Sequence, residues 1–366
     1  METVKIDVDI PQKPYQVLVG AGFRGERGAL IAALRPSGIL LVTDENVTPL
    51  YMEGVLGEFK EALPEVTTKT CILPPGEAAK SADSLAKVYD SALSAPALDR
   101  DGLIVALGGG AVGDVAGYTA ATLLRGIRWV QFPTTLLAML DSAIGGKTAI
   151  NHPAGKNLVG AFHQPSAVVC DVAWLDTLPM REYTAGLAEG VKTAVVADEA
   201  LFGFIESHTA ALLERDKEAV ARLVEGCVRI KARLVAEDER DTTGRRALLN
   251  FGHTLGHALE SLFPGRYLHG EAVAIGMVGA VLFSQGVCGL RDEDADRLTA
   301  VLEALGLKLT PPELDADGLL RAIATDKKRA GGAIRIVCLA RIGEGLVVNC
   351  GLDERLVVEL LGQEDE

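Results

Sequence analysis

The sequence has few aromatic residues, no long uncharged apolar run and no leader-like start. Aromatic side chains make up 5% of the 366 residues, so aliphatic side chains must fill most of the core. We identify no stretch of about 18 apolar residues without charge and therefore predict no transmembrane helix. The first residues, METVKIDVDIPQKPY, carry charges at alternate positions rather than a secretory apolar core, so we expect a cytoplasmic protein.

Cysteines are few and scattered. The six lie at positions 71, 170, 227, 288, 338 and 350, and no CxxC pair occurs among them. This spacing argues against a zinc knuckle or a redox pair. Several of them sit inside apolar runs such as IRIVCLA, so we expect buried free thiols of a reducing compartment.

Basic residues are also few relative to acidic ones, and the formal net charge is −14. A broad nucleic-acid-binding face needs a basic footprint, which this balance excludes. A small anionic substrate remains compatible with the sequence if basic side chains gather locally. We therefore expect a small-molecule partner, and neither a nucleic acid nor a membrane.

The first half of the chain alternates β-rich runs with helical ones. VKIDVDI, YQVLVG, GILLVTDEN, TKTCILP, GLIVALGGG, WVQFPTT and SAVVCDVAWL read as strands, and MEGVLGEFKEAL, SADSLAKVYDSALS and AVGDVAGYTAATLL as helices. This alternation predicts a layered α/β domain with a largely parallel sheet, of the Rossmann-like type.

From about Arg181 the chain becomes mostly helical. REYTAGLAEGVKTAVV, ALFGFIESHTAALLE, KEAVARLVEGCVRIKARLVAED, LNFGHTLGHALESLF, GEAVAIGMVGAVLFSQ and DADRLTAVLEAL all have helical periodicity, and only IRIVCLA looks like a strand. We place the boundary near Pro179, which predicts an α/β domain over 1–179 and a mostly α-helical domain over 180–366.

A glycine-rich turn follows one predicted strand in LIVALGGGAVGDVAG. Gly108, Gly109 and Gly110 would let backbone N–H groups approach a phosphate at the start of the next helix. The spacing is not GxGxxG, so a plain strand-to-helix turn is the alternative. Asp44, after another strand, is a candidate acceptor for a ribose hydroxyl.

Charged residues among small and apolar neighbours form a second group of candidates. The stretch LRGIRWVQFPTTLLAMLDSAIGGKTAINHPAGKNLVGAF is the densest example. Burying such charges is costly without a partner, so either a bound anion or internal salt bridges must balance them. Glu189 and Lys192 lie three apart on one helical face of AGLAEGVKTA, again among small residues.

The segment LNFGHTLGHALE places His253 and His257 one helical turn apart. This spacing suits two ligands of one zinc ion, although the Glu of an HExxH helix is absent. His269, in RYLHGEAV, precedes the next helix. Spacing alone favours His253 with His257, and for any single histidine a core or capping role is the alternative.

These motifs occur in an order that resembles the 3-dehydroquinate synthases, within the sugar phosphate cyclases. The ordered set is PGEAAK, GGGAVGDVAG, LRG, PTTLLAMLDSAIGGKTAINHPAGKNLVGAFHQP, LDTLP, GLAEGVK, LLNFGHTLGHALE, HGEAVAIGM and DKK. It covers roughly residues 40–345. The resemblance implies conversion of 3-deoxy-D-arabino-heptulosonate 7-phosphate to 3-dehydroquinate and phosphate, in the shikimate pathway of aromatic amino acid biosynthesis. It further implies a homodimer.

The resemblance also implies two cofactors, NAD and a zinc ion, with Co²⁺ as an alternative metal. It makes Glu189, His253 and His269 the metal ligands, and it gives His257 a catalytic or phosphate-contacting role instead. The NAD-binding positions that it implies are Asp44, Gly76, Glu77, Lys80, Gly109, Gly110, Gly113, Asp114, Thr134, Thr135, Lys147, Lys156, Leu175 and Thr177.

The resemblance also implies a set of substrate-site residues. Six of them are lysines or arginines, which suits a substrate that carries a carboxylate and a phosphate. The set is Arg125, Asp141, Lys147, Asn157, Lys192, Lys231, Arg246, Asn250, His257 and one of Lys327 and Lys328. Its density of cations fits anion binding by an acidic protein.

Three other functions remain open at the level of sequence. An amino-dehydroquinate or 2-deoxy-scyllo-inosose synthase would have nearly the same residues. A metal-dependent alcohol or glycerol dehydrogenase would share the two-domain plan but would not need so many cations. A binding protein that kept the fold would need intact catalytic positions by accident.

Overall fold

The structure, a computed structural model, describes residues 2–11, 13–311, 318–323 and 334–350. By the density of its contacts the chain divides into two compact units. Unit 1 comprises Met1–Leu178 together with Lys231–Arg240, and unit 2 comprises Pro179–Ile230 and Asp241–Glu366. The end of one helix from the second half of the sequence therefore packs within the first unit.

Unit 1 is built on a seven-stranded sheet. Its strands, in spatial order, are β1 (Val4–Val8), β2 (Tyr15–Gly20), β9 (Ala167–Asp171), β6 (Arg128–Pro133), β5 (Leu103–Gly108), β3 (Ile39–Asp44) and β4 (Thr68–Leu73). All neighbours are parallel except β1 and β2, which are antiparallel. The predicted parallel sheet is confirmed, and β3 and β5 are buried at every residue, as strands covered on both faces must be.

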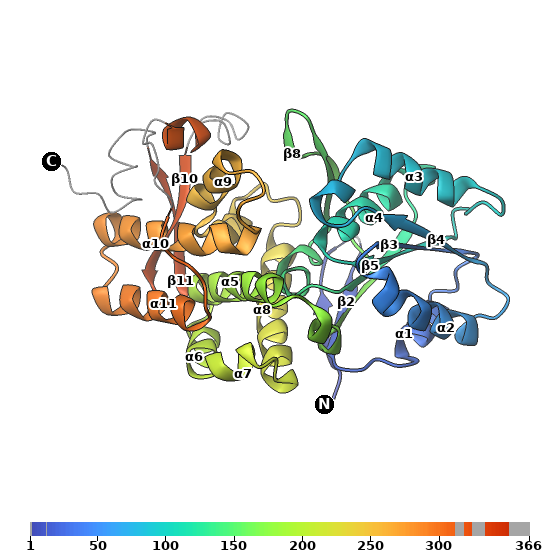
Figure 1. Ribbon diagram of the computed structural model, residues 1–366, viewed down its shortest axis with the longest axis horizontal. Helices are drawn as coiled ribbons and strands as arrows, with labels where there is room; N and C mark the ends of the chain where they lie inside the picture. Colours follow the sequence, from blue (N-terminus) through green and yellow to red (C-terminus); the bar gives the residue numbers. More distant parts are fainter. Residues whose placement is uncertain (1, 12, 312–317, 324–333, 351–366) are drawn as a thin grey trace. The chain divides into compact units, whose positions relative to one another are not determined.

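Helices cover both faces of this sheet (Figure 1). Helices α1 (Glu26–Ala33) and α2 (Glu53–Ala62) supply Ile31, Val55 and Phe59 to the core on one face. Helices α3 (Ala82–Leu93) and α4 (Gly110–Thr122) supply Val88 and Val115 to the core on the other. Short helical turns occupy Thr48–Met52 (η1), Gly76–Ala79 (η2), Leu123–Arg125 (η3), Ala138–Ser142 (η4) and Val172–Thr177 (η5).

The strand order reverses between β3 and β5. From β3 the chain moves to β4 at one edge, and then it returns to the other side of β3 to form β5 and β6. In open parallel sheets ligands bind outside the carboxyl ends of the strands at such a reversal. The fold therefore points to the ends of β3 and β5 as the place where a ligand binds unit 1.

An antiparallel hairpin in unit 1 was not predicted. It consists of β7 (Lys147–His152) and β8 (Gly155–Phe162). Thr148 and Ile150 are buried, and β7 lies against α4. The last part of the sequence motif dense in polar residues, from Lys147 to Phe162, is therefore a small sheet of its own.

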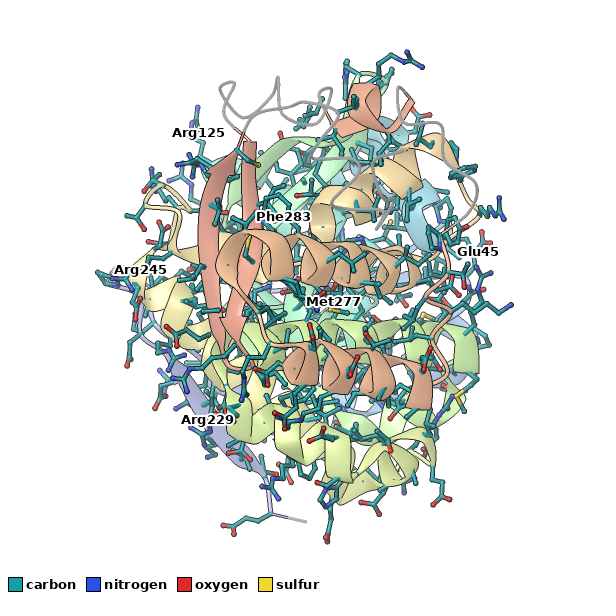
Figure 2. The ribbon with its side chains drawn as sticks, turned by 90° about the vertical axis from the view of Figure 1, so that its left-hand side faces the viewer. Glu45, Arg125, Arg229, Arg245, Met277 and Phe283 are labelled. Carbon is teal, nitrogen blue, oxygen red and sulfur yellow. The ribbon has the colours of Figure 1, made fainter. Side chains whose placement is uncertain are left out.

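Unit 2 is mostly helical. It contains α5 (Met180–Ala197), α6 (Glu199–Ser207), α7 (Thr209–Leu213), the first part of α8 (Lys217–Glu237), η6 (Arg245–Asn250), α9 (His253–Leu262), α10 (His269–Cys288) and α11 (Asp292–Ala304). A hairpin of β10 (Ile334–Arg341) and β11 (Glu344–Cys350) lies beside α10, which carries Met277 and Phe283 (Figure 2). The α/β and helical architecture predicted for the two halves is confirmed.

Three details of unit 2 differ from the sequence prediction. The expected helix over 200–214 breaks at His208, and β11 was not predicted. Helix α10 is long and apolar enough to cross a membrane by length and composition, a candidate that the search for an uncharged apolar run passed over because the helix contains Glu271. However, 61% of its apolar window is buried, as in the core helix of a globular unit. All six cysteines are free, as predicted, and four of them are buried.

Candidate active site

Three predicted metal ligands converge in unit 2. Glu189 lies on α5, His253 begins α9 and His269 begins α10. Their ligand atoms all lie within 4.8 Å of one another. Nε2 of His269 is 3.5 Å from Oε1 of Glu189. Two imidazoles and one carboxylate around an open position are a common ligand set for catalytic zinc.

Close helix packing brings these ligands together. A Cβ at Gly270 would lie 1.8 Å from the carbonyl oxygen of Ala185, so only glycine lets the start of α10 approach α5 this closely. A Cβ at Gly276 would lie 1.9 Å from the carbonyl oxygen of Gly252, which places the start of α9 directly on α10. These two contacts hold His269 near Glu189 and His253.

Each ligand histidine has its Nδ1 atom engaged by a neighbour. Nδ1 of His253 lies 3.2 Å from the carbonyl oxygen of Phe251, and Nδ1 of His269 lies 3.0 Å from Oε2 of Glu260. A carbonyl or an ionised carboxylate only accepts, so both Nδ1 atoms carry the hydrogen. Both Nε2 atoms are then left as electron-pair donors, as metal binding requires.

The electrostatic surroundings of the two histidines differ. Burial, followed by the positive charges of Lys192 and the neighbouring imidazoles, holds the pKa of His253 well below its usual value. Burial also acts to lower the pKa of His269, but the hydrogen bond to Glu260 and the charges of Glu189 and Glu260 outweigh it and raise the pKa. His253 is therefore neutral at neutral pH, the form in which imidazole binds metals.

Lys192 lies directly beside the ligand carboxylate. Its Nζ donates to Oε2 of Glu189, three residues earlier on α5, and both side chains are 1% exposed. The other carboxylate oxygen of Glu189, Oε1, is buried and has no hydrogen-bond partner. An unsatisfied buried oxygen that faces two histidines is the feature expected of a ligand atom without its metal.

His257 is exposed and borders the cluster. Its ring centroid is 5.2 Å from that of His253 and 6.0 Å from that of His269. His257 forms a separate group with Glu260 and His269. The pairing of His253 with His257, which spacing alone favoured, is thus replaced in the geometry by Glu189, His253 and His269.

Glu260 was missed in the sequence. In HTLGHALE it stands at i+7 from His253 and i+3 from His257, so all three share one face of α9. That periodicity was the available signal.

In unit 1 the predicted cofactor residues gather at the carboxyl ends of the parallel strands. Asp44 ends β3, Gly76–Lys80 follow β4, Gly109–Asp114 follow β5, Thr134 and Thr135 follow β6, and Leu175 and Thr177 follow β9. Only Lys147 and Lys156, on the β7–β8 hairpin, come from elsewhere. Five loops of one sheet edge thus carry nearly the whole set.

The glycine turn opens α4, which is 13 residues long. A Cβ at Gly110 would lie 2.8 Å from Oγ of Ser142, and this Oγ is buried without a hydrogen-bond partner. A Cβ at Gly113 would lie 2.2 Å from Nε2 of Gln131, a buried residue of β6. Gly110 therefore keeps the helix start open, whereas Gly113 lets α4 pack on the sheet.

Lys80 is the centre of a polar network that joins several predicted residues. Its buried Nζ donates to Oδ2 of Asp114 at 2.6 Å and to Oδ1 of Asn157. Asn151, which the sequence analysis did not select, donates to Glu77 at 2.7 Å and accepts from the backbone N–H of Asn157 at 2.9 Å. The network fastens the β7–β8 hairpin to the starts of η2 and α4.

Burial raises the pKa of Asp114 to about 6, although the charge and hydrogen bond of Lys80 oppose the shift. Burial likewise raises the pKa of Asp44, whose Oδ1 accepts the backbone N–H groups of Asn46 and Val47.

Elsewhere in unit 1, Lys231 at the end of α8 donates to Oδ1 of Asp141 at 2.6 Å. This pair joins two predicted substrate residues that are 90 positions apart.

The loop after β9 is fixed by Tyr51. Its hydroxyl donates to the carbonyl oxygen of Trp174 at 2.7 Å and also contacts Oγ1 of Thr177. The ring of Tyr51 stacks on that of Trp174 with centroids 4.9 Å apart. Leu175 and Thr177 are thus held at the sheet edge by a side chain that the sequence analysis did not select.

Arg125 is not brought together with the other predicted residues of unit 1. It has a positive φ of 70° and precedes β6, so it lies at the amino-terminal edge of the sheet. There it lines an open pocket of about 600 Å³ with Lys13, Arg100, Arg128 and His163. A six-residue strand such as β6 spans about 20 Å, which separates Arg125 from the residues at the carboxyl edge.

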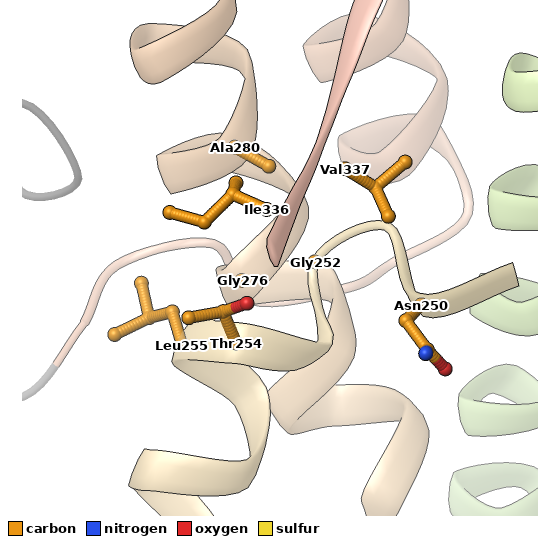
Figure 3. Close-up of a pocket in the computed structure, with 8 residues that line it drawn as sticks. All are labelled: Asn250, Gly252, Thr254, Leu255, Gly276, Ala280, Ile336 and Val337. Carbon is orange, nitrogen blue, oxygen red and sulfur yellow. The ribbon is translucent and has the colours of Figure 1, made fainter. Parts of the chain in front are cut away.

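The remaining predicted residues belong to unit 2. Arg246 is buried and Asn250 is exposed, both on η6. Asn250 borders a cavity of about 10 Å³, but its amide points away from Thr254 and Leu255 (Figure 3). The cavity has the volume of a single water molecule and does not suit a substrate. Lys327 and Lys328 lie outside the described residues.

The sequence matches two family profiles in succession. Residues 70–185 match the N-terminal part of 3-dehydroquinate synthase, and residues 186–329 match its C-terminal part. The 3-dehydroquinate synthase of Pelobacter propionicus is 44% identical over 96% of this chain and 98% of its own length. That of Geobacter sp. (strain M21) is 47% identical over 93% of both chains.

Solved structures of other cyclases have the same fold. The 2-epi-5-epi-valiolone synthase of Streptomyces hygroscopicus subsp. jinggangensis 5008, with NAD⁺ and Zn²⁺ bound, is 28% identical with a TM-score of 0.87, covering 96% of this chain and 97% of its own. A 2-deoxy-scyllo-inosose synthase with carbaglucose-6-phosphate, NAD⁺ and Co²⁺ is 23% identical with a TM-score of 0.88, covering 97% and 99%. An iron-containing alcohol dehydrogenase of Thermotoga maritima reaches a TM-score of only 0.66 at 17% identity, over 98% of this chain and 100% of its own. On the profiles and the curated relatives together, the chain belongs to the 3-dehydroquinate synthase family.

Proposed function

We propose that this protein converts 3-deoxy-D-arabino-heptulosonate 7-phosphate to 3-dehydroquinate and phosphate, with NAD⁺ and a divalent metal ion as cofactors. The observation that carries the proposal is the cluster of Glu189, His253 and His269 with Lys192 beside it. Family membership at 43–47% identity supports the reaction, and the cluster supports its metal dependence.

The residues of unit 2 fit a zinc ion. They offer the Nε2 nitrogens of two histidines, and Oε1 of Glu189 is buried and lacks a hydrogen-bond partner. Glu189, His253 and His269 would hold the ion, with Co²⁺ as an alternative. A metal so held supplies Lewis acidity toward the oxygens of the substrate.

The residues of unit 1 fit a dinucleotide. The start of α4 offers free backbone N–H groups and the positive end of the helix dipole, and a Cβ at Gly110 would obstruct it. Ser142 adds a buried hydroxyl without a partner at the same turn. Asp44 lies at the end of the adjacent strand, where a ribose hydroxyl would be bound. NAD⁺ supplies a hydride acceptor that is regenerated within the reaction.

Binding of the substrate anion falls to the cationic residues. Each unit offers side chains suited to the carboxylate and the phosphate of the substrate: Lys147, Lys231, Arg125 and Asn157 in unit 1, and Lys192, Arg246 and Asn250 in unit 2. Lys231 is oriented by Asp141, and Asn157 by Lys80, so at least two of these side chains are positioned before substrate binds. Fixed charges of this kind stabilise a departing phosphate without reorganising.

His257 is suited to proton transfer rather than to metal binding. Its ring is exposed and borders the cluster through His253 and His269. An imidazole that borders the metal ligands without being one of them can transfer a proton to or from a bound substrate. We assign to His257 the role of the base that accepts the proton lost from the substrate when phosphate leaves.

A cytoplasmic homodimer is part of the proposal. Arg125 lies at the amino-terminal edge of the sheet, whereas the cofactor residues of unit 1 lie at the carboxyl edge. Arg125 therefore needs a second copy of the chain if it is to contact the substrate. Two measurements test this point. Equilibrium sedimentation of the purified protein gives its oligomeric state, and an assay of phosphate release by an Arg125→Ala variant shows whether the reaction depends on Arg125.

Other cyclase substrates are the competing assignment. Phosphate release should be compared for 3-deoxy-D-arabino-heptulosonate 7-phosphate, its amino analogue and glucose 6-phosphate. The proposal expects the first substrate to exceed the others in kcat/KM. A higher kcat/KM for either of the other substrates would assign the protein to another type of sugar phosphate cyclase. Formation of NADH from a simple alcohol would identify it as a dehydrogenase.

A further inference from the structure

Glu260 contacts one ligand histidine on the side away from the metal-binding atom. Its Oε2 is 3.0 Å from Nδ1 of His269, while Nε2 of the same ring is 3.5 Å from Oε1 of Glu189. The imidazole of His269 therefore lies between two carboxylates. Only one of them, Glu189, also lies with His253 in the ligand cluster.

The two ring nitrogens of an imidazole are not independent. A carboxylate that accepts a hydrogen bond from Nδ1–H fixes the hydrogen there and makes Nε2 the electron-pair donor. It also holds the plane of the ring and increases the basicity of the ligand nitrogen. His253 obtains the same orientation from the carbonyl of Phe251, a neutral acceptor, so Glu260 is the charged member of this pair of contacts.

The location of Glu260 favours such a role over a surface ion pair. Its side chain is 15% exposed and that of His269 is 32% exposed. Glu260 sits on α9, whose first residue is His253, and it reaches His269 at the start of α10. One side chain thus links the two helices that supply the two histidine ligands.

We propose that Glu260 is a positioning residue that fixes the tautomer and orientation of His269 and thereby sets the affinity of the metal site. The inference rests on the proposed metal ligands Glu189, His253 and His269. Glu260 itself binds neither metal nor substrate in this role. The same contacts allow one competing role, because His257, Glu260 and His269 form a second group whose ligand atoms lie within 4.8 Å of one another.

The test compares Glu260→Ala, which removes the acceptor, with Glu260→Gln, which keeps a neutral acceptor of similar size. Glu206→Ala is the matched control, because it removes an ion pair to Arg297 that joins two other helices of the same unit, α6 and α11. Each full-length protein is stripped of metal and titrated with Zn²⁺ against a chromophoric chelator. Co²⁺ spectra and ¹⁵N resonances of the histidine rings are recorded in parallel.

Loss of this kind of contact weakens metal affinity by about 10- to 100-fold. We expect that loss in Glu260→Ala, a smaller loss in Glu260→Gln, and none in Glu206→Ala. The Zn²⁺-loaded wild type should show a hydrogen on Nδ1 of His269. Affinity of Glu260→Ala within twofold of the wild type would overturn the proposal. Two Zn²⁺ equivalents in the wild type and one in Glu260→Ala, with the tight site unchanged, would also overturn it and make Glu260 a ligand of a second ion.

Failure of the proposed function would look different. A wild-type protein that binds no Zn²⁺ would contradict the metal site itself. Tight binding by the wild type and the Glu260 variants alike would contradict only the role of Glu260.

Discussion

Lys192 and Glu189 form a buried ion pair one turn apart on α5, each with a side chain that is 1% exposed. The pair leaves the second carboxylate oxygen of Glu189 facing His269. Removing one partner of a buried pair strands the other charge in a medium of low dielectric constant. The stability of unit 2 should therefore depend on Lys192 and on metal together.

Lys192→Met should destabilise the metal-free protein by about 3–5 kcal/mol, because Glu189 is left as an uncompensated buried carboxylate. Bound zinc supplies positive charge beside the same carboxylate and should reduce this deficit. Calorimetric unfolding with and without zinc measures both values. Equal melting temperatures for the wild type and the variant in the absence of metal would show that the pair does not stabilise the fold.

Variants of the metal ligands should differ from a variant of His257 in their zinc content. Glu189→Ala and His269→Ala should lose stoichiometric zinc, because each removes one of three ligands. His257→Ala should keep zinc and lose about 10²- to 10⁴-fold in kcat, the usual contribution of an acid–base group. Metal content and phosphate release are measured on the same preparations. Retained zinc in both ligand variants would refute the assignment of the ligands.

Asp114 should make stability depend on pH in a defined window. Its folded-state pKa is raised from 3.8 to about 6, so the folded protein holds this proton more tightly than the unfolded chain. The free energy of unfolding should therefore fall as pH rises from about 4 to about 6 and then level off. Asp114→Asn cannot titrate, so its stability relative to the wild type should rise across that window. A difference that stays constant with pH would contradict the raised pKa.

Gly113 should prove to be a packing residue more than a phosphate contact. A Cβ there would lie 2.2 Å from the amide nitrogen of Gln131, so in Gly113→Ala either this buried side chain or α4 must shift. We expect a drop in melting temperature, and a smaller drop in the double variant Gly113→Ala/Gln131→Ala, with a coupling energy of about 0.5–3 kcal/mol. Additive effects would show that the two side chains do not collide.

Much of the fold could be predicted from the sequence because its elements have strong periodicity. The buried runs GLIVALGGG and GILLVTDEN became β5 and β3, and the glycine turn opened α4 as expected. The β7–β8 hairpin was missed because Lys147, Lys156 and Asn157 interrupt the apolar alternation that identifies a strand. These polar side chains are there for contacts such as that between Lys80 and Asn157, which local sequence does not reveal.

The candidate site was predictable only in part, because its residues come from distant positions in the sequence. Helical spacing favoured His253 with His257, whereas the cluster needs Glu189 from 64 positions earlier and His269 from another helix. Their convergence depends on the contacts of Gly270 with Ala185 and of Gly276 with Gly252, which no local pattern encodes. Resemblance to a family supplied what periodicity could not.

The most direct test follows phosphate and cofactor together. The zinc-loaded protein is given 3-deoxy-D-arabino-heptulosonate 7-phosphate with much less NAD⁺ than substrate. We predict many phosphates released for each NAD⁺, an equal amount of 3-dehydroquinate, and no net NADH. Release that stops at one phosphate per NAD⁺, or NADH that accumulates with product, would contradict the proposed reaction.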